Sequence, residues 1–240
     1  MNQKENQFIH LYNQFWTDTF ANGYDNQGDL EASLQFLRQL NIPTDSKILE
    51  IGCAIGKLCH ELDKIGFTSV KGIDISETAI QCGQNKYPHL SLNSYNGICL
   101  DFPDNSFNIC LSFDVVEHIP DIDNHFQDVV RILESSGKYI FQTPNILSNS
   151  VINTIIYKGR MTWKIYHPSL QSSFSLKRKL INAGFQKVEF VKISPLTEFK
   201  LAFLPFILQL VVKLVPWTWL PIWLQPNFFV IAYKNNSPNL

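Results

Sequence analysis

Short apolar runs alternate with amphipathic segments along most of the chain. Seven of these runs predict β-strands, in the segments 47–52, 69–75, 90–97, 107–114, 139–145, 186–193 and 227–234. Leucines recur at helical spacing over 29–40, and further helices are predicted over 56–65, 76–87, 121–134 and 175–185. A turn is expected at 135–138, before the fifth strand.

The alternation of strands and helices predicts an α/β fold with a mainly parallel sheet that helices cover on both faces. In such sheets ligands bind beyond the carboxyl ends of the strands, near the place where the strand order reverses. The chain has 240 residues and no internal repeat, which is enough for one domain of this kind and too short for two.

The composition argues against several classes of protein. Apolar residues make up 45% of the chain and charged residues 17%, which is typical of a globular core. The formal net charge of −1 argues against a nucleic-acid partner, because such binders are normally basic. The five cysteines form no C-x-x-C pair and are expected to be free thiols in a reducing compartment. The N-terminus lacks the apolar core of a signal peptide, so we expect a cytoplasmic protein.

The stretch ILEIGCAIGK, residues 48–57, joins the first strand to the next helix. Gly52 and Gly56 let the backbone approach a ligand closely, and Ala54 between them adds only a methyl group. Glu50 lies two residues before the first glycine, where its carboxylate repels phosphate and suits a cationic ligand. These features disfavour the dinucleotide of a nicotinamide dehydrogenase.

A second carboxylate, Asp74, lies at the end of the second strand, about twenty residues after the glycine loop. A carboxylate at this position can accept hydrogen bonds from both hydroxyls of a ribose. The alternative is that Asp74 only caps the following helix, although Ser76 is already available as the N-cap. We therefore expect Asp74 to bind a ligand.

Four motifs of the chain occur in the order and spacing of the class I S-adenosylmethionine-dependent methyltransferases. They are EIGCAIG at 50–56, GIDIS at 72–76, FPDNSF at 102–107 and DVVEHIPD at 114–121. YIFQTPN and LINAGF also resemble that family's fifth strand and last helix, so the resemblance covers roughly residues 45–193 and the final strand. It implies a Rossmann-like, seven-stranded, mainly parallel sheet with an antiparallel last strand, and S-adenosyl-L-methionine as the cofactor.

The resemblance also implies where the methionine part of the cofactor lies. Gly52 and Gly56 would pass under it, together with Cys53 between them. Glu50 would face its amino group, through water or through the loop.

The nucleoside part and the acceptor pocket follow from the same resemblance. Asp74 would hold the ribose, and Ile75 would pack against the adenine. Asn96 takes the place of the acidic residue that family members usually offer to the adenine amino group. Phe113 and Asp114 end the fourth strand, where family members touch the methionine end and begin the acceptor pocket.

The cluster Asp114-x-x-Glu117-His118 resembles the E-x-x-E-H run of the ubiquinone-pathway O-methyltransferases, the members that this chain resembles most, and of the small-RNA 2′-O-methyltransferases. In those families the carboxylates and histidines bind a divalent ion that holds the acceptor oxygen. His167 is the candidate fourth ligand, which makes these residues candidates for Mg²⁺, Mn²⁺ or Zn²⁺. Two alternatives remain open: His118 acts with Glu117 as a catalytic acid or base without a metal, or the pair is structural.

These inferences predict an S-adenosylmethionine-dependent methyltransferase that methylates an oxygen of a small or lipophilic acceptor, quinol-like or lipid-linked. The sulfonium makes the methyl group electrophilic, so the enzyme must hold the acceptor in line with it. His118 could take the proton of an oxygen acceptor. One alternative is a sugar or glycan acceptor, and another is a non-catalytic cofactor-binding partner at a membrane.

An apolar, aromatic insertion, residues 194–226, separates the sixth strand from the seventh. Its prolines rule out one continuous transmembrane helix, and its tryptophans favour a membrane–water interface. Three alternatives remain open: peripheral contact with the inner membrane surface through 199–224, a dimer surface, or a wall of the active site. The rest of the single domain would be a core, 45–193 and 227–235, and an N-terminal helical lid, 1–44. The aromatic residues expected in this lid are Phe8, Tyr12, Phe15, Trp16 and Phe20.

Overall fold

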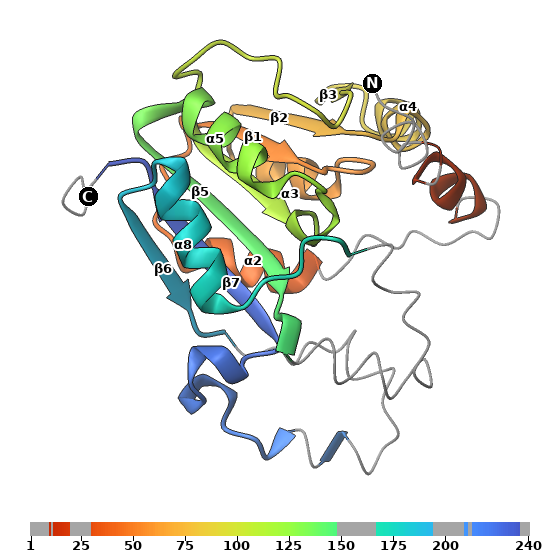
Figure 1. The fold of residues 1–240 in the computed structure, drawn as a ribbon. Coiled ribbons are helices and arrows are strands. Elements are labelled where there is room, and N and C mark those ends of the chain that lie inside the picture. The colour runs from red at the N-terminus through yellow and green to blue at the C-terminus, as the bar shows by residue number, and fades with distance from the viewer. Residues whose placement is uncertain are drawn as a thin grey trace.

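The computed structural model describes residues 10, 12–19, 30–147, 167–193, 209–210 and 213–235. Within them, one sheet has the strand order β3-β2-β1-β4-β5-β7-β6 (Figure 1). Its strands are β1 (Lys47–Ile51), β2 (Ser69–Asp74), β3 (Ser91–Ser94), β4 (Phe107–Phe113), β5 (Leu133–Pro144), β6 (Lys187–Val191) and β7 (Asn227–Tyr233). The strands β1 to β5 are parallel, and β7 runs antiparallel to β5 and β6. The predicted seven-stranded α/β sheet with an antiparallel last strand is confirmed.

The strand order reverses between β1 and β4. From β1 the chain moves outward through β2 to β3, and it then returns to the other side of β1 with β4. The residues that follow β1, β2 and β4 therefore meet at one edge of the sheet, which is where ligands bind in folds of this kind.

Helices cover both faces of the sheet. Their bounds are α2 (Leu30–Arg38), α3 (Lys57–Lys64), α4 (Glu77–Lys86), α5 (Ile122–Ile132) and α8 (Ser173–Ala183), with a short 3₁₀ helix η1 (Val116–His118). Side chains of α2 and α3 pack on one face, and side chains of α5 and α8 pack on the other. Alternate residues of β7 join the two clusters, as a strand with both faces buried requires.

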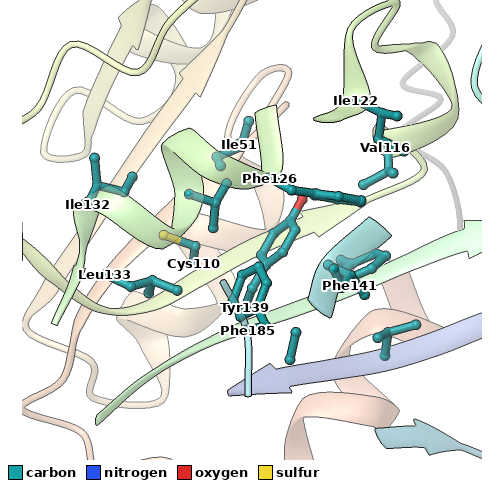
Figure 2. Packing of buried hydrophobic residues seen from close by; sticks show 14 of the residues in the cluster. Ile51, Cys110, Val116, Ile122, Phe126, Ile132, Leu133, Tyr139, Phe141 and Phe185 are labelled. Carbon is teal, nitrogen blue, oxygen red and sulfur yellow. The ribbon is translucent and has the colours of Figure 1, made fainter. Parts of the chain in front are cut away.

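Aromatic rings fill the core on the side of α5 and α8 (Figure 2). Tyr139 stacks on Phe141 with 4.6 Å between the ring centroids. The Tyr139 hydroxyl is satisfied inside this core, because it lies 2.6 Å from Ser112 Oγ and 3.1 Å from Nε2 of His125. Burial lowers the pKa of His125 to about 4, so the imidazole is neutral in the folded protein at physiological pH.

The fifth strand begins earlier than the sequence predicts. β5 starts at Leu133, directly after α5, and it continues through 135–138, where we expected a turn. The register between β4 and β5 shifts between Phe107 and Ile109, so the extra residues of β5 form an irregularity in the ladder. Their serines and glycine have the composition of a turn, and the chain folds back within them, because a Cβ on Gly137 would lie 2.8 Å from the carbonyl oxygen of Glu134 and 3.0 Å from Cβ of Leu133.

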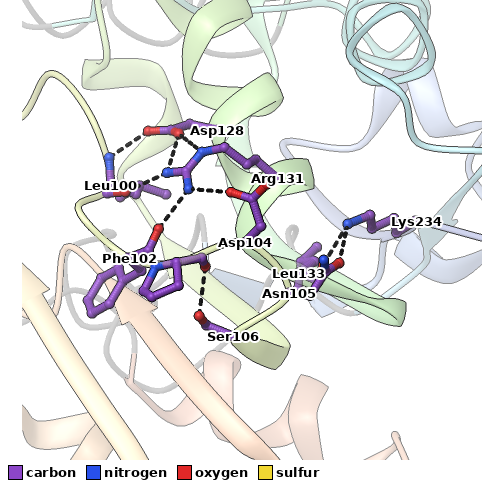
Figure 3. A network of polar contacts seen from close by, with 10 residues as sticks. Leu100, Phe102, Asp104, Asn105, Ser106, Asp128, Arg131, Leu133 and Lys234 are labelled. Atoms are coloured by element: carbon purple, nitrogen blue, oxygen red, sulfur yellow. Dashed lines mark hydrogen bonds and ion pairs between the residues drawn. The ribbon is translucent and has the colours of Figure 1, made fainter.

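Arg131 on α5 fastens the connection between β3 and β4 (Figure 3). Its guanidinium donates to the carbonyls of Phe102 (2.7 Å) and Leu100 (2.6 Å) and to the carboxylates of Asp104 (3.0 Å) and Asp128 (2.8 Å). The planar fork of an arginine suits such a set of acceptors, whereas a lysine would satisfy fewer of them. The FPDNSF motif is therefore held in place by α5.

The segment before β7 is tied to the end of β5. It contains two 3₁₀ helices, η2 (Trp217–Trp219) and η3 (Ile222–Leu224). The side-chain amide of Asn145 donates to the carbonyls of Trp223 (2.9 Å) and Gln225 (2.8 Å). Trp219 nevertheless is 84% exposed and Trp223 is 55% exposed.

Residues 194–208 and 211–212 of the predicted insertion lie outside the described part of the chain. Among the helices that are described, none is long and apolar enough to cross a bilayer.

Candidate active site

The loop after β1 turns through three residues in the left-handed region, with φ of 78° at Gly52, 50° at Ala54 and 79° at Gly56. The N–H of Gly52 donates to the carbonyl of Ile73 (2.8 Å), which ties the loop to β2. A Cβ on Gly52 would lie 2.3 Å from a methyl carbon of Val115, so only glycine fits there. Ala54 adopts the left-handed conformation although it carries a Cβ, and a left-handed alanine costs roughly 1–2 kcal/mol.

Asp74 connects this loop to the start of α4. Its Oδ2 accepts from the N–H of Ala54 (2.8 Å), and its Oδ1 accepts from the N–H of Ser76 (2.9 Å). The N-cap of α4 is Ser76, whose Oγ accepts from the N–H of Ala79 (3.2 Å). Burial raises the pKa of Asp74, and the backbone hydrogen bonds act in the opposite direction. A carboxylate has roughly four acceptor positions, so both oxygens retain capacity for ribose hydroxyls.

Glu50 is the second buried carboxylate at this edge of the sheet. Its Oε2 accepts from the thiol of Cys59 on α3 (2.9 Å). Burial raises the pKa of Glu50 to about 7, the hydrogen bonds of Cys59 oppose this, and the carboxylate of Asp74 adds to it. Two carboxylates buried this closely are costly, and a bound cation would lower that cost. The residues therefore fit a cofactor that carries positive charge.

A helical segment, residues 12–19, lies against the loop and α4. Trp16 is buried in one cluster with Ile55 and Ala79. The side-chain oxygen of Asn13 accepts from the hydroxyl of Ser76 (2.9 Å). Of the aromatic residues expected in the lid, Phe8 and Phe20 lie outside the described residues, and Phe15 is exposed.

Tyr12, on the same segment, lies between Asp74 and the Asp114–His118 run. Its ring meets the ring of His118 edge-on, with centroids 5.7 Å apart. Burial raises its pKa, and the charges of Glu117 and Asp74 raise it further, so the phenol lies near both carboxylates. The structure thus gathers Tyr12, Asp74, Glu117 and His118 around one place.

Glu117 is buried below His118. Its Oε2 accepts from the hydroxyl of Thr143 at the end of β5 (2.9 Å), and its Oε1 lies 3.9 Å from Nε2 of His118. Burial raises the pKa of Glu117 well above its usual value, and the carboxylate of Asp114 adds to the shift. Asp114 itself is exposed and has a left-handed φ of 54°. The run leaves β4 through this turn, and η1 then directs Glu117 inward.

His167 reaches the same place from a distant part of the sequence. Its ring lies 4.7 Å from the ring of His118, and the N–H of Ser169 donates to the backbone carbonyl of Glu117 (3.0 Å). Burial lowers the pKa of His167 to about 4, and His118 lowers it further, whereas Asp114 acts in the opposite direction. Sequence reasoning and the structure therefore agree that these two histidines are neighbours.

The predicted metal site is not supported by the positions of these side chains. Metal ligands must place their donor atoms close together around a common point. Among the described residues, Asp114, Glu117, His118 and His167 do not provide three ligand atoms within 4.8 Å of one another. We therefore derive no chemical step through a metal at this site.

Three predicted cofactor residues use their side chains elsewhere. The amide oxygen of Asn96 accepts from the N–H groups of Ile98 (2.9 Å) and Cys99 (3.3 Å), so it closes its own turn. The thiol of Cys53 belongs to a buried cluster under the loop. The ring of Phe113 packs edge-on against Phe36 of α2, 6.5 Å away. The amide oxygen of Asn96 is thus already used within its turn, whereas Phe113 remains half-buried.

Two residues at the site were missed by the sequence reasoning. Tyr95 donates its backbone N–H to the carbonyl of Asp74 (3.0 Å), and burial and Asp74 together raise the pKa of its phenol. Thr143 holds Glu117. Tyr95 directly follows β3 and Thr143 lies in the last two residues of β5, so their places at the ends of strands that neighbour β2 and β4 were the signal that could have revealed them.

Ile75 and Gly97 complete the nucleoside side of the site. Ile75 is half-buried directly after Asp74, and a Cβ on Gly97 would lie 3.1 Å from one of its methyl carbons. The arrangement offers an apolar contact beside Asp74, and at the other end a histidine that is 23% exposed next to a buried glutamate. Such a site can bind a cationic nucleoside and move a proton at an adjacent acceptor.

Comparisons with known proteins agree with this geometry. The family model described as a methyltransferase domain matches residues 23–189. A probable S-adenosylmethionine-dependent methyltransferase of Mycobacterium tuberculosis is 30% identical over 148 residues, which are 60% of this chain and 50% of that protein. The chain thus spans about half the length of that relative.

Two further proteins are similar over more of the chain. A demethylmenaquinone methyltransferase of Chlorobaculum tepidum is 25% identical over 186 residues, 70% of this chain and 77% of that protein. The solved structure of Haemonchus contortus phosphoethanolamine N-methyltransferase 2, in complex with phosphomonomethylethanolamine and S-adenosylhomocysteine, superposes with a TM-score of 0.63. It is 19% identical and covers 97% of this chain and 60% of that one, so this likeness concerns the fold. Because the family model matches most of the chain, the protein belongs to the class I S-adenosylmethionine-dependent methyltransferases.

Proposed function

We propose that this chain binds S-adenosyl-L-methionine between the loop after β1 and the helical segment 12–19, and that it transfers the methyl group to an acceptor beside His118. The observation that carries the proposal is the pair of buried carboxylates, Glu50 and Asp74, on either side of a left-handed glycine loop. When bound, the cofactor supplies an electrophilic methyl group on a positively charged sulfur.

Each part of the site has a task in this proposal. The backbone of Gly52, Cys53 and Gly56 lets the methionine part approach, and Glu50 provides negative charge below it. Asp74 accepts from the ribose hydroxyls, which keeps the nucleoside in one orientation. The helical segment 12–19 covers the site and excludes water.

His118 is the proposed proton acceptor. It is partly exposed, and it is held between the rings of Tyr12 and His167 above the buried carboxyl of Glu117. An acceptor hydroxyl that binds here can pass its proton to His118 as the new bond to carbon forms, and Glu117 orients the imidazole. The separated donor atoms of the Asp114–His167 set favour this role over a metal-held acceptor.

For the acceptor we propose a small or lipophilic molecule, quinol-like or lipid-linked, that is methylated on oxygen. Two observations support the lipophilic, quinol-like character of this acceptor. A relative that matches 70% of the chain is named for demethylmenaquinone. Trp219 and Trp223 are exposed in a segment that hydrogen bonds tie to the end of β5, close to Thr143 and therefore to Glu117. We propose that this segment contacts the inner membrane surface peripherally, where such acceptors are found.

Isothermal titration calorimetry with S-adenosylhomocysteine tests the cofactor site. The wild-type chain should bind it, and Asp74→Asn should bind at least about tenfold more weakly, because a carboxylate accepts from ribose hydroxyls more strongly than an amide. Asp101→Asn, on an exposed surface, is the matched control and should bind like wild type. Absence of binding by the wild-type chain at millimolar ligand would overturn the proposal.

Transfer of a labelled methyl group tests the acceptor and His118 together. Lipid and aqueous extracts are incubated separately with methyl-labelled cofactor and either wild type or His118→Ala. We expect label in the lipid extract, reduced on the order of 10²–10⁴-fold by the substitution, with S-adenosylhomocysteine affinity retained. Label only in the aqueous extract would favour a polar or glycan acceptor, and equal transfer by His118→Ala would remove His118 from the chemistry.

A further inference from the structure

Three side chains that could ligate a metal converge outside the methyl-transfer site. His60, Asp63 and His89 each offer one ligand atom, and these atoms lie within 4.8 Å of one another. In the described part of the chain, no other set of three or more histidine, cysteine or acidic side chains meets this condition. None of the three has a task in the proposed methyl transfer.

The fold brings these residues together from two elements. His60 and Asp63 are three residues apart on α3, which places them on the same side of the helix. His89 lies in the connection between α4 and β3. The ring of His60 stacks on Tyr87 with centroids 4.3 Å apart. Tyr87 lies two residues before His89 in the chain, so the α4–β3 connection also orients the imidazole of His60.

A second observation indicates a missing ligand. Nδ1 of His60 is buried and, among the contacts of the described residues, has no hydrogen-bond partner. Buried polar atoms without a partner are rare in proteins, since each costs on the order of 1–3 kcal/mol. A cation bound to this imidazole, or a water held by that cation, would provide the partner.

The distances suit a transition metal. Ligand atoms around tetrahedral zinc lie roughly 3.3 Å apart, because each Zn–N or Zn–O bond is about 2.0–2.1 Å. Nε2 of His89 and Oδ2 of Asp63 are already 3.5 Å apart. Both side chains are about half exposed, so they can rotate toward His60 without disturbing the core.

We propose that His60, Asp63 and His89 bind a divalent cation of the Zn²⁺ class, which joins α3 to the α4–β3 connection. Two imidazoles and one carboxylate select zinc over Mg²⁺ or Ca²⁺, which prefer oxygen ligands. A fourth position remains for water. β3 begins next to His89, so the site lies toward the amino end of this strand, away from the sheet edge that carries the glycine loop. The metal would therefore act as a structural link between α3 and the α4–β3 connection.

Calorimetry with zinc chloride and the full chain tests the site. Wild type should bind one Zn²⁺ per chain, and His89→Ala and Asp63→Asn should each bind at least about tenfold more weakly, since each loses one of three ligands. His10→Ala removes another exposed histidine and is the matched control. A double variant, His118→Ala/His167→Ala, removes the other pair of neighbouring histidines and should retain the binding.

Cobalt provides a second readout, because tetrahedral Co²⁺ with such ligands absorbs in the visible range. We expect this absorption in wild type and its loss in His89→Ala, with excess Mg²⁺ unable to displace the metal. The proposal is overturned if His89→Ala binds Zn²⁺ as wild type does, or if wild type does not bind it. Since His89→Ala leaves the cofactor residues intact, its affinity for S-adenosylhomocysteine should not change, which separates this test from that of the methyl-transfer site.

Discussion

At the scale of single residues, the site holds charges that do not favour folding. Glu50 and Asp74 are each 6% exposed, and Glu117 is 1% exposed. Burial raises the pKa of all three carboxyls, which means that their ionised forms are less stable in the folded chain than in water. The negative charge of these carboxylates would stabilise a bound cationic ligand, whereas in the ligand-free protein the same charge is destabilising.

Glu50→Gln should therefore stabilise the ligand-free protein at neutral and alkaline pH. The pKa of Glu50 is about 7 in the folded chain against an ordinary value of 4.5. Its contribution to stability is complete below pH 4.5 and is lost as the pH rises through 7. The free energy of unfolding of the variant minus that of wild type should thus grow by about 3 kcal/mol between pH 4.5 and 8.

Urea unfolding at several pH values measures this difference. The comparison uses variant minus wild type because His125, whose pKa falls to about 4, changes stability in the opposite direction over part of the range. Glu31→Gln, at an exposed position, controls for the loss of one carboxylate. A difference that does not change with pH would show that Glu50 is not the buried acid described here. The same variant should bind S-adenosylhomocysteine more weakly at pH 8.

Residue identities predicted the site better than they predicted what each side chain does. Asp74 could be found because a carboxylate at a strand end has few structural reasons to be there, and Glu117 because it belongs to the DVVEHIPD motif. Asn96 lies where the resemblance puts it, yet its amide oxygen closes its own turn. The strained backbone of Ala54 was not predictable because sequence does not reveal φ, and its N–H is bound by Asp74, twenty residues away.

At the scale of elements, the helical segment 12–19 and α5 hold the loops that form the site. Among residues 12–19 only Trp16 is fully buried, and the segment contacts the rest of the chain through Tyr12, Asn13 and Trp16, whereas Arg131 holds α5 to the β3–β4 connection. Elements with few buried contacts open at lower free energy than the core does. We therefore expect the two to respond differently when a fastening residue is changed.

Asn13→Ala should loosen the helical segment without unfolding the protein. The substitution removes the acceptor for the Ser76 hydroxyl, a loss of roughly 1 kcal/mol, which corresponds to about fivefold in S-adenosylhomocysteine affinity. Amide hydrogen exchange should accelerate within 12–19. Gln14→Ala is the control, because its side chain is exposed and bonds only within the segment, to Asp18. Equal exchange in the two variants would contradict this role of Asn13.

Arg131→Lys should lower the free energy of unfolding by about 1–3 kcal/mol. A lysine cannot satisfy the carbonyls of Leu100 and Phe102 together with the carboxylate of Asp104. Arg38→Lys is the matched control, since its exposed ion pair with Glu31, 3.7 Å long, is worth little. Urea unfolding measures both, and similar losses in the two variants would show that the fork has no special role.

The elements themselves were largely predictable from periodicity. The apolar runs placed all seven strands, and Ser76 and Gly184 marked the start of α4 and the end of α8. The start of β5 at Leu133 was not predictable, because the serine–glycine stretch after Leu133 folds back as a turn would, and the strand includes it as an irregularity of the ladder with β4.

At the scale of the whole molecule, two regions distant in sequence meet beside the Asp114–His118 run. The end of β5 holds Glu117 through Thr143 and the tryptophan segment through Asn145. An acceptor that enters past exposed tryptophans would therefore arrive close to His118. The apolar insertion was visible in the sequence, but a pattern of tryptophans and prolines does not show which of them are exposed.

Liposome flotation tests the proposed membrane contact. Each tryptophan can bury on the order of 150–250 Å², so wild type should float with liposomes, while Trp219→Ser/Trp223→Ser should not. Phe174→Ser removes another large apolar side chain, 78% exposed on α8, and should float like wild type. With a net charge of −1, the protein should float equally well with neutral and anionic lipids. A wild-type chain that stays at the bottom would favour a dimer surface or a pocket wall.

The hydrogen bonds of Asp74 and Ser76 have a consequence for the order of events in turnover. One continuous series of bonds runs from Ala54 through Asp74 and Ser76 to Asn13. In the proposed site the helical segment covers the nucleoside, so we expect the Ser76–Asn13 bond to open before the spent nucleoside leaves, cofactor to bind before acceptor, and demethylated cofactor to leave last. Rapid-mixing experiments should then show a first turnover that is faster than the steady state, because release of the nucleoside would be the rate-limiting step.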